Sequence, residues 1–168
     1  MVASAGISVV LIGGAAVNTY VEPRYTKDID LTVEADPAGL ETLTGLLRDA
    51  GFATVRHQPG EESSGPDFIQ LKREATHDMV DLIAAKTPFQ RFLMKRAERR
   101  DGQWLPVATP EDLIVLKLIA NRSRDRLDVH HLATQYPIDW PYVAEWAATW
   151  GVADRLQALR EALAAEEN

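Results

Sequence analysis

Two aspartates that alternate with apolar residues constrain this chain more than any other feature. The segment Asp28-Ile29-Asp30-Leu31 is typical of a β-strand, on which successive side chains point to opposite faces of a sheet. Asp28 and Asp30 therefore share one face, and Ile29 and Leu31 share the other. Two neighbouring carboxylates repel each other unless a cation lies between them or one of them binds a proton. Oxygen ligands of this kind suit Mg²⁺ or Mn²⁺, so the strand is a candidate metal site.

A pair of glycines precedes this strand by about the length of a short helix. The apolar run at residues 7–12 predicts a buried strand, and it ends directly before Gly13 and Gly14. Bare backbone at the start of a helix binds anions through its N–H groups. An anion site next to a pair of metal-binding acids indicates chemistry on a nucleoside triphosphate.

Composition narrows the class of protein. The chain has 168 residues, enough for one domain or for one domain with an appendage. It contains no cysteine, which excludes disulfides, thiolate zinc sites and a cysteine nucleophile. No signal-peptide pattern and no membrane-spanning apolar run is present, so we expect a cytoplasmic protein with no membrane partner.

The charge of the chain is unevenly distributed. A net charge of −7 argues against nucleic-acid binding by the whole surface. Residues 86–100 nevertheless hold six of the 18 Lys and Arg residues. This stretch is a candidate binding patch for an RNA acceptor, and a solvated helix face is the alternative interpretation.

Periodicity and turn residues predict a mixed α/β part followed by helices. Strands are predicted at 7–12, 28–34, 52–57, 67–73, 79–84 and 104–107, and helices at 15–21, 37–50, from Pro88 onward, 110–122, 124–135, 140–150 and 152–166. The strands at 67–73 and 79–84 are expected to form a hairpin. We therefore expect an α+β protein with a small mixed β-sheet flanked by helices. Its α/β core should cover residues 1–108, and a helical region at 109–168 should pack on that core.

A third acid lies within one of the predicted strands. Asp81 is placed between Val80 and Leu82, and an acid among apolar residues is costly unless it is paired or bound to a metal. If this strand pairs with residues 28–34, Asp81 completes a three-carboxylate cluster. Such a cluster can hold two metal ions for in-line phosphoryl or nucleotidyl transfer.

These motifs together resemble a known family. Gly13-Gly14, Asp28-Ile29-Asp30-Leu31 and Val80-Asp81-Leu82 are similar in order and spacing to the nucleotidyltransferase superfamily with the polymerase-β-like fold. More narrowly, residues 24–31 resemble the Arg-x-Thr-x-Asp-hydrophobic-Asp signature of minimal bacterial nucleotidyltransferases. These include the AbiEii-like proteins of toxin–antitoxin and abortive-infection systems. Residues 110–128 also resemble the downstream lysine and arginine/aspartate segment of those proteins.

The resemblance implies a role for each motif residue of the predicted core. Asp28 and Asp30 would bind Mg²⁺ or Mn²⁺, and Asp81 would be the third ligand or would activate the acceptor hydroxyl. Gly13 and Gly14 would hold triphosphate oxygens through their backbone N–H groups. Cationic groups and the metal would neutralise the charge that develops on the phosphates and on the leaving pyrophosphate.

The resemblance also implies roles for residues around this core. Arg24 and Thr26 would lie beside the phosphates or brace the acidic strand. Lys117 would reach the triphosphate and contribute to catalysis. Asp125 and Asp128 would orient Lys117, Arg122 or the nucleotide, and ion pairs on a helix surface explain these two acids almost as well.

The resulting expectation is a metal-dependent nucleotidyltransferase that binds an NTP, such as ATP. It would pass an NMP to a hydroxyl on an RNA 3′ end, a protein side chain or a small molecule. One alternative is a catalytically weak, partner-binding member of a toxin–antitoxin pair, which would bind its cognate toxin or antitoxin. Another is metal-dependent phosphate hydrolysis on a different scaffold, which explains the acids but not the glycine pair before them.

Overall fold

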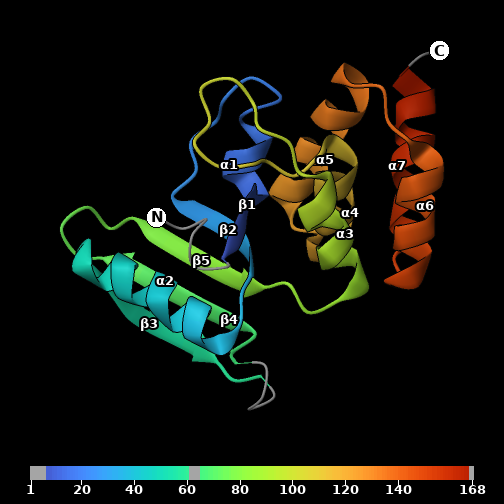
Figure 1. The fold of residues 1–168 in the computed structure, drawn as a ribbon. Helices are drawn as coiled ribbons and strands as arrows, with labels where there is room; N and C mark the ends of the chain where they lie inside the picture. The colour runs from blue at the N-terminus through green and yellow to red at the C-terminus, as the bar shows by residue number, and fades with distance from the viewer. Residues whose placement is uncertain (1–6, 61–64, 167–168) are drawn as a thin grey trace. The chain divides into compact units, whose positions relative to one another are not determined.

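The chain forms two compact units in the computed structural model, which describes residues 7–60 and 65–166 (Figure 1). The α/β unit contains the described residues up to Ala15 together with Tyr25–Ala108, and the helical unit contains Ala16–Arg24 together with the described residues from Thr109 onward. The chain therefore passes between the two units three times. The sequence pattern had placed residues 16–24 in the first unit.

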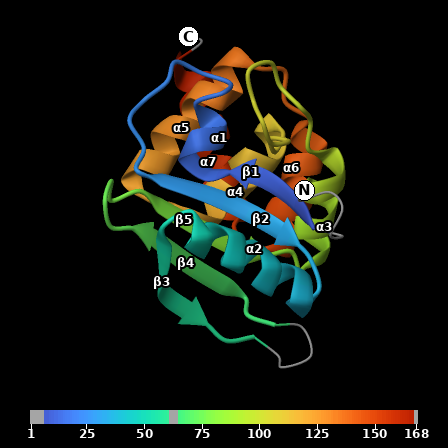
Figure 2. The same cartoon turned by 60° about the vertical axis from the view of Figure 1, so that its left-hand side comes forward.

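The α/β unit is built on a five-stranded sheet with the strand order β1-β2-β5-β4-β3 (Figure 2). The strands are β1 (Ser8–Ile12), β2 (Asp28–Glu34), β3 (Phe52–Gln58), β4 (Phe68–Arg73) and β5 (Met79–Ala84). β2 and β5 pair in parallel, and the other neighbours pair antiparallel. The predicted hairpin is confirmed as the β4–β5 pair, and the mixed sheet confirms the expected α+β class.

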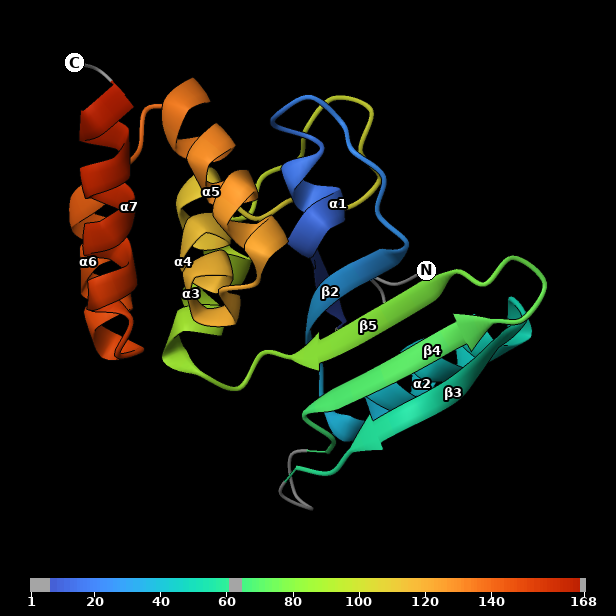
Figure 3. The ribbon, with the colours of Figure 1, turned by 180° about the vertical axis from the view of Figure 1, so that it is seen from behind.

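One face of this sheet is buried and the other carries polar side chains. Burial alternates along β4 and β5 as a strand requires, and the buried positions are Ile69, Leu71, Val80 and Leu82. Helix α2 (Pro37–Asp49) lies against the β3 side of the sheet (Figure 3). Leu40 and Thr44 of this helix line a hollow together with Ile69, so α2 covers the apolar face. Asp81, which alternates with Val80 and Leu82, belongs to the opposite face.

The predicted edge strand at 104–107 is wrong. Only Val107 forms isolated bridges, one with Leu11 of β1 and one with Glu98, in the part of the chain that the structure describes. Pro106 accepts a hydrogen bond from the Leu11 N–H at 2.8 Å but has no N–H to donate, so a regular ladder cannot continue through it. The segment instead closes a loop that follows helix α3 (Pro88–Arg96).

The helical unit consists of helices that pack on one another. They are α4 (Pro110–Ala120), α5 (Ser123–Gln135), α6 (Trp140–Thr149) and α7 (Ala153–Glu166). α4 contacts α5 and α6, and α7 contacts the same two helices. Each of the four agrees with its predicted range within two residues. No helix in the described ranges combines the length and apolar character needed to cross a lipid bilayer.

Residues 16–24 join the helical unit through contacts with α5 and with Tyr136, the residue that follows α5. The chain enters the segment within the short helix α1 (Gly13–Val17), which starts earlier and is shorter than predicted. The Tyr136 hydroxyl donates to the Tyr20 carbonyl oxygen at 2.6 Å, and the two rings meet edge to face with centroids 5.3 Å apart. Arg24 forms an ion pair with Asp128 of α5. These partners are more than 100 residues apart in sequence, so no local pattern identifies them.

Candidate active site

The α/β unit brings two of the three predicted acids side by side. Asp30 of β2 and Asp81 of β5 are direct partners in the parallel pairing, and both are half-buried. Asp28 lies two residues before Asp30, beside Met79, and is exposed. Partners on neighbouring strands project from the same face, so the three carboxylates share the face opposite α2.

The donor set fits a nucleotide-bound divalent cation better than a site made by protein alone. Among the residues that the structure describes, no group of three or more His, Asp or Glu side chains is arranged to hold a metal ion. Mg²⁺ is commonly bound by one or two carboxylates together with substrate phosphates and water. The adjacent carboxylates of Asp30 and Asp81 provide hard oxygen donors of that kind.

Gly13 lies against the carboxylate of Asp30. Ile12 is the β1 partner of Asp30, so Gly13 is the first residue beyond the paired strand. A Cβ atom built on Gly13 would lie 1.9 Å from Asp30 Oδ2, and the residue has a φ of +67°. Both its backbone conformation and the approach of Asp30 therefore require glycine at this position.

We expect Gly13→Ala to displace the Asp30 carboxylate and to destabilise the α/β unit. Positive φ costs a non-glycine residue about 1–2 kcal/mol, and the clash adds to this cost. Gly51→Ala is the matched control, because Gly51 has a φ of +88° but no atom within 4 Å of an added Cβ. Urea unfolding of both variants measures the two costs. An equal loss of stability in the two variants would contradict the close packing of Gly13 and Asp30.

Sequence reasoning missed a neutral partner of Asp81. Gln70 of β4 is the direct antiparallel partner of Asp81, and its Nε2 atom donates to Asp81 Oδ1 at 2.8 Å. The register of the predicted hairpin was the available signal, because it pairs these two positions. Thr26, another predicted site residue, donates from its hydroxyl to the Asp28 carbonyl oxygen at 3.3 Å and so contacts the start of β2.

The helical unit contains the other predicted charged residues in one buried charge cluster, which we define as Arg24, Lys117, Asp125 and Asp128. Lys117 Nζ lies 3.0 Å from Asp125 Oδ1 and 2.6 Å from Asp128 Oδ2. Arg24 donates to both Asp128 oxygens, from Nε at 2.8 Å and from Nη2 at 2.6 Å. Lys117 is 6% exposed and Asp128 is 1% exposed. Asp128 is therefore shared by two cations, which compensates the cost of its burial.

These contacts shift the pKa of both partners. Burial of Asp128 opposes its ionisation, but the hydrogen bonds from Arg24 and Lys117 and the charges of both cations outweigh this effect and lower its pKa below the usual 3.8. The hydrogen bond to Asp128 raises the pKa of Arg24. Arg24 and Asp128 are therefore both charged at neutral pH.

Asp125 connects this cluster to the start of α5. Its Oδ2 atom accepts a hydrogen bond from the Arg122 backbone N–H at 3.1 Å, while Oδ1 contacts Lys117. Arg122 thus contributes its backbone to the arrangement. This hydrogen bond at the N-terminus of α5 fixes the Asp125 side chain, and Asp125 in turn fixes the ammonium group of Lys117.

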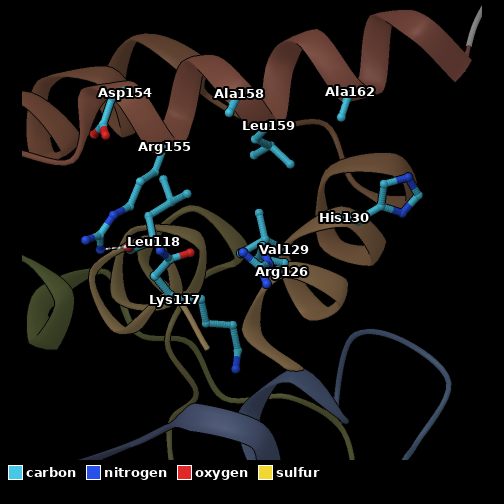
Figure 4. A pocket seen from close by; sticks show the side chains of 11 residues that line it. Lys117, Leu118, Arg126, Val129, His130, Asp154, Arg155, Ala158, Leu159 and Ala162 are labelled. Carbon is cyan, nitrogen blue, oxygen red and sulfur yellow. Dashed lines mark hydrogen bonds between the residues drawn. The ribbon is translucent and has the colours of Figure 1, made fainter. Parts of the chain in front are cut away.

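A cavity of about 370 Å³ lies next to this cluster, between α4, α5 and α7 (Figure 4). Lys117 contributes to its lining, and Figure 4 shows its side chain directed away from α7. Arg155 of α7 donates to the carbonyl oxygens of Leu118 and Ile119 at 2.8 and 3.0 Å. Arg155 therefore satisfies the last carbonyls of α4, and we assign it a structural role.

Comparison with protein families identifies the family to which this chain belongs. Residues 2–167 match the family described as nucleotidyl transferase AbiEii toxin, type IV TA system. The chain belongs to this family. It is therefore a nucleotidyltransferase of a toxin–antitoxin type, as the sequence motifs had indicated. No curated protein matches the sequence.

Solved structures show the same fold at low sequence identity. The antibiotic-resistance factor ANT(2″)-Ia is 12% identical with a TM-score of 0.57, over 99% of this chain and 92% of that one. The lincosamide antibiotic adenylyltransferase LnuA, with lincomycin bound, is 15% identical with a TM-score of 0.55, over 77% and 88% of the two chains. The Megavirus polyadenylate synthase is 14% identical with a TM-score of 0.51, over 82% of this chain but 30% of its own. This AbiEii-family chain thus has the nucleotidyltransferase fold.

Proposed function

We propose that this AbiEii-family protein transfers an NMP group from an NTP to an acceptor hydroxyl, with Mg²⁺ or Mn²⁺ as cofactor. The observation that carries the proposal is the direct pairing of Asp30 with Asp81, with Asp28 on the same face of the sheet. Like charges at directly paired strand positions repel each other, and a divalent cation bound by both carboxylates removes that repulsion.

The reaction exchanges one phosphorus–oxygen bond for another. The acceptor hydroxyl oxygen bonds to the α-phosphorus, the bond from that phosphorus to the pyrophosphate oxygen breaks, and the hydroxyl proton passes to the Asp81 carboxylate. The divalent cation, when bound, neutralises phosphate charge. Asp28, Asp30 and Asp81 would hold that cation, and the backbone N–H groups of Gly13 and Gly14 would bind triphosphate oxygens.

Residues of the helical unit are proposed to assist nucleotide binding. Lys117 would bind the triphosphate, and Asp125 and Asp128 would fix its orientation. Arg24 would fix Asp128 in turn. The contacts within the buried charge cluster support this order of roles, because each cation in it has a defined carboxylate partner.

We propose RNA as the acceptor, on the evidence of exposed cations and aromatic rings in α3 and in the loop that follows it. Arg91, Phe92 and Lys95 belong to the helix, and Arg99 and Trp104 belong to the loop. Trp104 is 92% exposed and Phe92 is 52% exposed. The Lys95 ammonium lies 6.0 Å from the Phe92 ring centroid, and Arg99 donates to the Trp104 carbonyl oxygen at 3.4 Å. Exposed aromatic rings among cations bind single-stranded nucleic acid by base stacking and phosphate contacts.

Pyrophosphate release tests the proposed reaction. The protein is incubated with each labelled NTP and Mg²⁺, with and without RNA, and products are separated by size. Label in RNA supports both parts of the proposal. Label in a small molecule or a protein retains the nucleotidyltransfer and contradicts the RNA acceptor. No pyrophosphate release with any of these acceptors contradicts the reaction itself.

We expect Trp104→Ala and Lys95→Glu each to weaken binding of a single-stranded RNA about tenfold. Stacking on one aromatic side chain contributes about 1–3 kcal/mol, and each phosphate contact adds a salt-dependent share. Arg124→Glu is the control for charge, because Arg124 is an exposed cation of the helical unit. Fluorescence anisotropy at two salt concentrations measures the affinity. Equal weakening by Arg124→Glu would indicate a general charge effect and would contradict a defined surface.

The family also suggests a protein partner. We propose that a cognate antitoxin acts on this protein or its products, since the family is described as a toxin of a type IV TA system. Growth of cells that express the protein with and without the neighbouring gene tests this proposal. Rescue of growth by that gene is the expected result, and toxicity that the gene leaves unchanged would contradict it.

A further inference from the structure

The carboxylate of Asp81 lies between an acid and an amide in one row across the sheet. Asp30 is its partner on β2, and Gln70 is its partner on β4. Neighbouring strands are about 4.8 Å apart, and side chains at paired positions project from the same face. The Asp81 carboxylate therefore has a neighbour of like charge on one side and a hydrogen-bond donor on the other.

The contact from Gln70 is a well-formed hydrogen bond. Its Nε2 atom lies 2.8 Å from Asp81 Oδ1, and the bond is partly buried. The bond engages one carboxylate oxygen and limits rotation of the side chain. A ligand or proton acceptor held in one rotamer needs less ordering when the cation or substrate arrives.

The donor opposite Asp81 is neutral, although cations are present on β4 and on its neighbour β3. Lys72 of β4 lies 3.7 Å from Glu74, and the Arg56 guanidinium of β3 lies 5.6 Å from the Phe68 ring centroid. An ammonium or guanidinium group at position 70 would neutralise Asp81 and compete with a divalent cation. An amide orients the carboxylate and leaves its negative charge available.

We propose that Gln70 is a positioning residue that holds the Asp81 carboxylate in place for the divalent cation. This inference rests on the proposed function, because it assumes that Asp81 acts in nucleotidyl transfer. In this role Gln70 sets the geometry of the Asp81 side chain. Gln70 itself contacts neither the nucleotide nor the cation. Partners that orient metal ligands in this way typically change metal affinity 10- to 100-fold when they are removed.

Binding of Mn²⁺ to the full chain, measured by electron paramagnetic resonance in the presence of a saturating non-hydrolysable NTP analogue, tests the proposal. We expect Gln70→Leu to raise the Kd for Mn²⁺ about tenfold or more. Gln70→Lys can still donate a hydrogen bond but adds a charge, and we expect it to raise this Kd at least as much. Gln58→Leu, an exposed glutamine of β3, is the matched control and should leave the Kd within about twofold.

A structural role for Gln70 predicts a different result. If its hydrogen bond only fastens β4 to β5, Gln70→Leu lowers the urea midpoint and leaves the Kd for Mn²⁺ unchanged, and Gln70→Lys binds Mn²⁺ like the wild type. Either result would overturn the inference. Asp81→Asn separates this failure from that of the proposed function. Loss of Mn²⁺ binding in Asp81→Asn but not in Gln70→Leu rejects Gln70 alone, whereas unchanged binding in Asp81→Asn rejects the proposed role of Asp81.

Discussion

Replacing Asp30 by Asn is expected to lower the rate of pyrophosphate release at least about 1,000-fold, equivalent to about 4 kcal/mol of transition-state stabilisation. Asp30 is central among the three acids, because it is the partner of Asp81 and follows Asp28 by two residues on the same strand. An amide has the same shape but no charge, so it binds a divalent cation poorly. The fold should persist, since asparagine has nearly the same size as aspartate and can keep the close packing of this side chain against Gly13.

The measurement combines turnover with stability. Initial rates with saturating NTP and increasing Mn²⁺ are compared for the wild type and Asp30→Asn, and urea midpoints are recorded for both. Asp49→Asn is the control, because Asp49 is an exposed acid at the end of α2. A stable Asp30→Asn variant with wild-type rates would show that the paired carboxylates do not perform the reaction.

Replacing Asp128 by Asn is expected to give the largest loss of stability, about 3 kcal/mol at pH 7. The change removes the carboxylate that Arg24 and Lys117 share and leaves an amide that donates toward two cations. Removal of one partner from a buried ion pair typically costs 3–5 kcal/mol, and the remaining contact of Lys117 with Asp125 places the expected value at the lower end. Glu41→Gln is the control, because Glu41 pairs with Arg48 on the exposed side of α2 and should cost less than about 1 kcal/mol.

Tryptophan fluorescence can assign this loss to the helical unit. Of the four tryptophans, Trp140, Trp146 and Trp150 belong to that unit and only Trp104 belongs to the α/β unit. In a Trp104→Phe background, emission therefore reports unfolding of the helical unit alone. If Asp128→Asn leaves this transition unchanged, the buried charge cluster contributes no net stability.

The same variant predicts a pH dependence. The folded-state pKa of Asp128 is lowered below 3.8, so its ionised form stabilises the fold above that pH. This stabilisation is lost as the pH falls from 3.8 through the lower folded-state pKa. The difference in unfolding free energy between the wild type and Asp128→Asn should therefore be constant from pH 7 to pH 5 and should shrink below about pH 4. A difference that is independent of pH would contradict the charged state of Asp128.

Local patterns predicted the elements of this fold but not all of its connections. The alternation in residues 28–34 and the paired runs at 67–73 and 79–84 reproduce strands of the sheet because half-buried strands have a period of two. Residues 104–107 also looked extended, but Pro106 cannot donate to a ladder. The parallel pairing of β2 with β5 entered the sequence interpretation only as a condition, since no turn connects the two strands.

The acids of the candidate site were predictable from the sequence, but their side-chain partners were not. The acids at 28, 30 and 81 were identified from the cost of placing carboxylates in strands, and their roles remain predictions. Gln70 was missed because glutamine at an alternating position is ordinary until the hairpin register is known. The contact of Arg24 with Asp128 was missed because it joins residues 104 positions apart, and the motif had suggested phosphates or the acidic strand as the surroundings of Arg24.

The threefold passage of the chain between the two units limits how the protein can be dissected. A cut between Ala108 and Thr109 separates the sequence into halves but leaves residues 16–24 on the wrong fragment. The C-terminal piece would then lack Arg24, the ion-pair partner of Asp128. The N-terminal piece would carry residues 16–24 without the helices on which they pack. Independent expression of the two halves should therefore give poorly folded peptides, and co-expression should restore a folded heterodimer by fragment complementation.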